Sequence, residues 1–138
     1  MSSATDTEAA EAADLDAPGH PLAGTPLYLS PEALDGRAAG EDMDVWALAL
    51  VVFEMITGTH PWRATTFDDV LRQVRRTDAI DVRTWAPATP APVADAIAAA
   101  LHPDRAQRLA TAREFGAALR TGLAAVPVLP PFHPTGAP

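Results

Sequence analysis

The most regular feature of the hydrophobic pattern is an unbroken apolar run from Val45 to Phe53, inside the stretch 41–58. A surface helix carries one apolar stripe, whereas a helix that is apolar all round is enclosed by other parts of a protein. The stretch allows about five turns, too few to span a bilayer. Gly58 follows the last periodic residue, where helices commonly end. The pattern therefore predicts a buried central helix that ends before Gly58.

Two acids lie within this predicted helix, and each needs a partner if it is buried. Asp44 lies in the first turn, where the helix dipole favours negative charge, and Glu54 follows the apolar run. Asp44 is either a surface acid that faces the dipole or a buried acceptor for backbone N–H groups of a neighbouring loop. The pattern leaves both possibilities open.

A short helical turn is predicted before the central helix. Ser30 is a favoured N-cap residue, Pro31 suits the first helical position, and Glu32 places an acid behind it. Gly36 closes the turn. Upstream, residues 27–29 are predicted to form a short extended piece.

Three further helices are predicted after the central one, over about 67–76, 92–102 and 111–121. Each shows apolar residues at helical spacing. Thr66 with Asp69, and Thr111 with Glu114, have the spacing of N-terminal capping arrangements. Together with the central helix they predict a mainly α fold.

The two ends of the chain differ in composition from this folded region. Residues 1–20 are small, polar and acidic without a hydrophobic period, and we interpret them as a disordered acidic tail. Residues 122–138 are rich in proline and predict a disordered, polyproline-prone tail. The predicted domain organisation is therefore a folded region over 21–121 between two tails.

Charge and composition narrow the functional classes. The formal net charge is −8, which gives nucleic-acid binding no electrostatic support. There is no cysteine and no signal peptide, which together favour a cytoplasmic protein that does not contact membranes. The ten basic residues are all arginine, and lysine and asparagine are absent. Richness in alanine and arginine is typical of a GC-rich genome, and we infer a bacterial source.

Four short motifs follow one another along the folded region. Residues 24–32 read GTPLYLSPE, 44–48 read DVWAL, 54–62 read EMITGTHPW, and 104–108 read DRAQR. Their order and spacing resemble the second half of the large lobe of a bacterial-type serine/threonine protein kinase. That family has G-T-x-x-Y-x-A-P-E, D-x-W-S-L, E-M-L-T-G-x-x-P-F and D-P-x-x-R at these places. The resemblance covers about residues 23–121 and implies a partial kinase-like large lobe, a helical subdomain without the small lobe.

The resemblance also implies roles for individual residues. Glu32 and Arg108 are expected to form a buried ion pair that ties the end of the activation segment to the later helices. Asp44 and Trp46 are expected to anchor the central helix. Asp44 would accept backbone N–H groups from the catalytic loop, and Trp46 would pack under the end of the activation segment.

Gly24, Thr25 and Tyr28 are expected to lie on the substrate side, with Thr25 in contact with the acid and the lysine of the catalytic loop. The sequence departs from the family pattern at Ser30 and at two later positions. Ser30 stands for the alanine of A-P-E; the other departures are Ala49 for a glycine in the central helix and Leu109 for the proline after the arginine.

Phosphoryl transfer in this family needs a glycine-rich loop, a strand lysine, a catalytic aspartate, and an asparagine and an aspartate for Mg²⁺. The sequence has no lysine, no asparagine, no His-Arg-Asp and no Asp-Phe-Gly. We therefore expect a truncated kinase domain that keeps substrate-side and scaffold helices but is inactive alone. No catalytic residue, cofactor or metal is assigned to this chain, because ATP and Mg²⁺ would belong to the complete domain.

In the family, the catalytic loop and an upstream helix cover part of the central helix. Without them, one side of that helix would form a large exposed apolar patch, which usually marks an interaction surface. We expect this side to bind a protein partner or a complementing kinase half, or to self-associate. The alternative is a non-catalytic interaction or regulatory module derived from a kinase lobe.

Overall fold

The structure is a computed structural model that describes residues 25–76, 78–124 and 126. The predicted acidic tail, Gly24 and residues 125 and 127–138 lie outside the described residues. The predicted start of the disordered proline-rich tail at residue 122 is too early, because Gly122 and Leu123 belong to the last helix. Within the described ranges the chain forms helices and no strands. The helices are η1 (Thr25–Tyr28), α2 (Pro31–Leu34), α3 (Glu41–Thr57), α4 (Phe67–Val74), η2 (Val82–Thr84), α5 (Ala91–Ala100), η3 (Arg105–Gln107) and α6 (Ala112–Leu123). The predicted mainly α fold is therefore confirmed. None of the described helices combines the length and the apolar character that crossing a bilayer requires.

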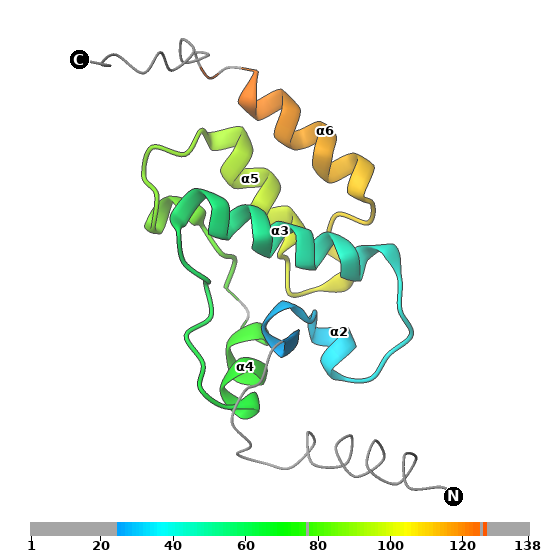
Figure 1. Ribbon diagram of the computed structural model, residues 1–138. Coiled ribbons are helices and arrows are strands. Elements are labelled where there is room, and N and C mark those ends of the chain that lie inside the picture. The colour runs from blue at the N-terminus through cyan, green and yellow to red at the C-terminus, as the bar shows by residue number, and fades with distance from the viewer. Residues whose placement is uncertain (1–24, 77, 125, 127–138) are drawn as a thin grey trace, which may run out of the picture.

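Helix α3 crosses the middle of the molecule, as Figure 1 shows, and the other helices are arranged around it. α5 and α6 pack closely against each other, and both contact α3. On the other side of α3, η1 contacts both α3 and α4, and α2 contacts α4. Side chains from these helices meet in one hydrophobic core, whose largest fully buried members are Trp46, Phe53, Phe115 and Leu50.

The ends of α3 follow from its sequence. Its first turn carries Glu41, Asp42 and Asp44, which suit the positive end of the helix dipole. It ends at Gly58, whose φ of 73° lies in the left-handed region that glycine adopts without a steric penalty. The Gly58 N–H donates to the Glu54 carbonyl oxygen at 2.7 Å. The predicted position and end of the central helix are confirmed.

The hydrophobic pattern alone predicts that α3 is enclosed on every side, and this is wrong for the described chain. The exposed apolar side expected from the kinase resemblance is present instead. Val45, Ala49 and Phe53 are fully buried beneath neighbouring helices. Leu48 and Val51 are 42% and 44% exposed, and Met55 is 79% exposed. No described segment covers this second face, which we call the open face of α3. The hydrophobic pattern shows only that these residues are apolar. Whether they are buried depends on whether another segment of the protein packs over them.

The shorter helices begin where their caps predict. The Ser30 hydroxyl accepts from the Ala33 N–H at 3.3 Å, and the Thr66 hydroxyl accepts from the Asp69 N–H at 3.2 Å. Thr111 forms a complete capping box with its partner three residues later. The predicted N-termini are therefore confirmed within a residue, while α4 ends two residues earlier than expected and α6 two residues later.

Residues 27 and 28 are not extended as predicted, because they belong to the 3₁₀ helix η1, which ends just before Leu29. Leu27 and Tyr28 pack against the hydrophobic core. The tight helix thus places both side chains against α3 and α4, an arrangement that local turn residues do not specify.

Candidate functional site

The structure brings Glu32 of α2 and Arg108, which follows η3, together although they are 76 positions apart. Arg108 Nη1 and Nη2 donate to the two carboxylate oxygens of Glu32, the second at 3.1 Å. The Arg108 side chain is completely buried and Glu32 is 6% exposed. Arg108 Nε donates to the His102 carbonyl oxygen at 2.9 Å. The guanidinium is therefore held on three sides and fixes α2 to the segment after α5.

Opposing effects act on the pKa of Glu32. Burial favours the neutral carboxyl, but hydrogen bonds from Arg108, from its own backbone N–H and from Ser30 favour the carboxylate. The hydrogen bonds prevail, so the pKa of Glu32 lies below its usual value. The pair is consequently a buried carboxylate and a buried guanidinium, and each compensates the charge of the other.

Trp46 lies beside this ion pair. The Arg108 guanidinium carbon lies 4.8 Å from the centre of the Trp46 ring, which is cation–π geometry. The ring of Trp46 also stacks on the ring of Trp62, with ring centroids 6.2 Å apart and an interplanar angle of 21°. Trp46 Nε1 is buried without a hydrogen-bond partner among the described residues. Trp46 thus connects α3 to both the ion pair and the loop after α3.

A second ion pair at this site was not predicted. Arg105 Nε and Nη2 donate to the two oxygens of Asp42 at 2.5 and 3.0 Å, and the hydrogen bond from Arg105 lowers the pKa of Asp42. Arg108 Nη1 also lies 4.0 Å from Asp42. A Cβ on Gly40 would lie 2.7 Å from Asp42 Oδ1 and 2.9 Å from Arg105 Nη2, so glycine leaves room for the pair in this geometry. The available signal was Arg105 itself, which replaces the proline of D-P-x-x-R.

Tyr28 is held by α3 through Glu54. Its hydroxyl donates to Glu54 Oε1 at 2.6 Å, which supplies the partner that Glu54 needs. The His60 ring packs edge-on against Tyr28 at 5.2 Å. Burial lowers the pKa of His60, against the opposing effect of Glu54. Thr25 begins the same 3₁₀ helix. These contacts fix η1, and with it the start of the described chain, on the central helix.

Replacing Tyr28 with Phe is expected to lower the free energy of unfolding by about 1 kcal/mol, because a partly exposed hydrogen bond to a carboxylate is lost. Urea unfolding followed by far-ultraviolet circular dichroism measures the change. Glu54→Met, which has no oxygen to accept the hydrogen bond, is the matched partner variant. If Tyr28→Phe costs as much in the Glu54→Met background as in the native chain, the hydrogen bond does not supply the effect.

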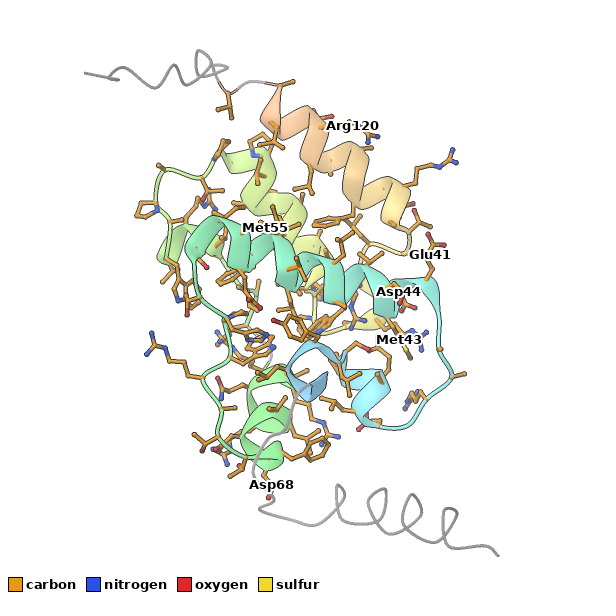
Figure 2. The ribbon with its side chains drawn as sticks, in the orientation of Figure 1. Glu41, Met43, Asp44, Met55, Asp68 and Arg120 are labelled. Atoms are coloured by element: carbon orange, nitrogen blue, oxygen red, sulfur yellow. The ribbon has the colours of Figure 1, made fainter. Side chains whose placement is uncertain are left out.

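An apolar groove of about 500 Å³ lies between α2 and the first half of α3, and we call it the α2–α3 groove. It is lined by Tyr28, Leu29, Ser30, Ala33, Ala39, Gly40, Met43, Asp44 and Ala47. Figure 2 shows Met43 and Asp44 near the N-terminal end of α3 and Met55 near the other end. Its lining residues Asp44 and Ala47 lie within about one helical turn of Leu48, so the groove adjoins the N-terminal end of the open face.

Asp44 is exposed, not buried as a hydrogen-bond acceptor. No backbone N–H of the described residues donates to its side chain, so the described chain matches the surface-acid alternative. The expected partner is a catalytic loop, and no described segment reaches Asp44 in its place. Asp44 therefore stands as an acid at an otherwise apolar groove.

Within the described ranges, no three His, Asp or Glu side chains gather in a way that could hold a metal ion. What the described site offers chemically is recognition: an apolar groove, an open helix face, and one carboxylate between them. The buried pair of Glu32 with Arg108 and the partly exposed pair of Asp42 with Arg105 stabilise the surface on which these features lie.

Comparison with known proteins identifies the class. The family model described as the protein kinase domain matches residues 5–117, which include all four motifs and begin upstream of them. Because this match covers well over half of the chain, the protein belongs to the protein kinase domain family.

Its relatives are serine/threonine kinases of eukaryotes. The chain is 43% identical over 49 residues to mitogen-activated protein kinase kinase kinase 18 of Arabidopsis thaliana, and 42% identical over 57 residues to serine/threonine-protein kinase greatwall of Canis lupus familiaris. It is 33% identical over 95 residues to a probable serine/threonine-protein kinase of Dictyostelium discoideum. The matched parts are 36%, 41% and 69% of this chain. They span 14%, 6% and 4% of the relatives, so the chain corresponds to a small part of each.

These findings confirm the protein kinase domain family, and the assignment to its bacterial type stays a prediction. Together with the helical structure, they confirm that the fold is that of a partial kinase-like helical lobe.

Proposed function

We propose that this chain supplies the substrate-side and scaffold helices of a serine/threonine protein kinase large lobe, and that a second polypeptide covers its central helix. The covering polypeptide would carry the remaining part of a kinase domain. Alone, the chain would neither bind ATP with Mg²⁺ nor transfer a phosphoryl group.

The observation that carries this proposal is the open face of α3. Leu48, Val51 and Met55 expose apolar side chains on a helix whose opposite face is fully buried. Exposed apolar surface of this kind typically marks an interaction site. The α2–α3 groove continues the apolar surface, and Asp44 supplies an acceptor for backbone N–H groups of the covering segment. An apolar surface with a single carboxylate suits a polypeptide loop, whose backbone N–H groups can donate to the carboxylate, better than it suits a charged ligand.

The proposed inactivity of the isolated chain has a chemical basis. The printed sequence has no lysine for the α/β-phosphates and no asparagine for Mg²⁺. Isothermal titration of the full chain with ATP and Mg²⁺ is expected to give no heat of binding at micromolar concentrations. Addition of a separately produced kinase polypeptide with a glycine-rich loop, His-Arg-Asp and Asp-Phe-Gly should restore binding if the chain complements a kinase. If that polypeptide binds without restoring nucleotide binding, the non-catalytic interaction module is the better description.

Replacing Val51 with Glu is expected to prevent association through the open face, because association would bury the added charge without a partner. Sedimentation analysis of the full chain alone should show concentration-dependent self-association through this face, and Val51→Glu should be monomeric. A hydrophobic dye should bind the native chain and bind the variant less.

Ala117→Glu on α6 is the matched control, since residue 117 is exposed and lies outside the open face. It should behave like the native chain. A native chain that stays monomeric, binds no dye and unfolds cooperatively would contradict the proposed interaction surface.

We also propose a bacterial, cytoplasmic origin. The basic residues are all arginine, and the chain lacks cysteine, lysine and asparagine. This composition supports a GC-rich genome and a reducing compartment.

A further inference from the structure

A second apolar groove, of about 330 Å³, lies at the end of the molecule away from α2. It is formed by the C-terminal ends of α3 and α6 and by the segment that leads into α5, and we call it the C-terminal groove. Its lining includes Ile56, Ala88, Pro90, Leu123 and Val126. Leu123 is 55% exposed, and Ile56 and Val126 are 36% and 40% exposed. Covering these side chains would remove apolar surface from water, which lowers the free energy.

The chemistry of the groove restricts what can occupy it. No charged side chain lines it, and its polar member, Thr89, already donates to the Ala86 carbonyl oxygen at 2.7 Å. An occupant with charges would lose hydration without gaining partners. The groove therefore suits an uncharged, apolar segment, which excludes the acidic residues 1–16 as its occupant.

The segment that follows the groove has this composition. Residues 127–132 read PVLPPF, with three large apolar side chains and no charge. Val126 lines the groove, so the chain enters this segment at the groove itself and little loop-closure entropy opposes docking. Proline-rich segments favour the extended polyproline II conformation, so that less conformational entropy is lost when they bind an apolar groove.

We propose that residues 127–132 of the same chain dock in the C-terminal groove. Val128, Leu129 and Phe132 cover Ile56, Leu123 and the rim at Ala88. At about 3.1 Å per residue in polyproline II, the six residues span about 19 Å. The proline-rich tail is then an integral cover of the α3, α5 and α6 ends.

Nuclear magnetic resonance relaxation of the full chain tests this assignment. The backbone order parameters of Val128, Leu129 and Phe132 should be about 0.85, as in the helices, and should fall below about 0.6 for residues 135–137. Methyl contacts should join Leu129 to Leu123 or Ile56. If the native chain self-associates, the same measurements are made in the Val51→Glu background.

Ala88→Glu places a charge at the exposed rim of the groove, and we expect it to release the segment, so that the order parameters of 128–132 fall to those of 135–137. Ala117→Glu, with the same charge change outside the groove, should leave them unchanged. Equal and low order parameters throughout 128–137 in the native chain would overturn the proposal. Methyl contacts that occur only between differently labelled copies would assign the groove to the tail of a second molecule and would likewise overturn it.

Discussion

Replacing Arg108 with Leu is expected to lower the free energy of unfolding by about 3–5 kcal/mol, the usual cost of removing one partner of a buried ion pair. The carboxylate of Glu32, 6% exposed, would lose the charge that compensates its burial. Urea unfolding at pH 7, followed by far-ultraviolet circular dichroism, measures the change.

Arg105→Gln is the matched control. Its guanidinium is paired with Asp42 but is 41% exposed, so its loss should cost much less stability than the loss of Arg108. A double variant with Glu32→Met and Arg108→Met should be more stable than Arg108→Leu, because it leaves no lone buried charge. Equal effects of Arg108→Leu and Arg105→Gln would contradict the importance of burial.

The pair of Glu32 with Arg108 also predicts how the stability lost in Arg108→Leu depends on pH. The pKa of Glu32 is lowered on folding, so its stabilising contribution is present above the unfolded value, about 4.3, and is lost as the pH falls through the folded pKa. In Arg108→Leu, protonation of Glu32 removes the lone charge. The difference in stability between the native chain and this variant should therefore be large at pH 7 and should shrink as the pH falls through the folded pKa of Glu32. A difference that is independent of pH would exclude the carboxylate as its cause.

Replacing Trp46 with Ala should also lower the free energy of unfolding by about 3–5 kcal/mol, because a large, fully buried side chain leaves a cavity. The cavity would remove the surface on which Trp62 stacks and over which Arg108 lies. Urea unfolding measures the loss, and the native-state fluorescence of the remaining tryptophans should shift to longer wavelength as Trp62 gains solvent.

Trp46→Phe separates ring packing from the indole N–H. Because Nε1 has no described hydrogen-bond partner, Phe keeps the stacking and loses no hydrogen bond. The expected cost is about 1–2 kcal/mol, from lost volume alone. If Phe proved as destabilising as Ala, an interaction of the indole nitrogen would have to be responsible.

The position of α3 and the starts of the shorter helices could be predicted from sequence, because apolar periodicity and caps such as Ser30 and Thr111 act within a few residues. The open face of α3 could not be predicted from the same pattern. The run from Val45 to Phe53 is equally apolar on both faces, and only the arrangement of other segments decides which face is covered.

The contacts of the candidate site likewise include some that could be predicted from the sequence and some that could not. The pairing of Glu32 with Arg108 was expected from the resemblance to the kinase family, since no local signal joins residues so far apart. The pairing of Asp42 with Arg105 was missed because Asp42 precedes its motif and Arg105 stands where the family motif has a proline, so the resemblance assigns a partner to neither residue. Glu54 was recognised as needing a partner, but Tyr28 became that partner through the unexpected 3₁₀ turn of η1.

The long sequence separation of Glu32 and Arg108 has a kinetic consequence. The chain between them contains α3, α4 and α5, so a long loop must close before the two charges meet, and we expect the pair to form late in folding. An interaction completed after the folding barrier contributes little to the folding rate and mainly slows unfolding. The ion pair is therefore expected to slow unfolding of the core, and so to lengthen the lifetime of the folded state.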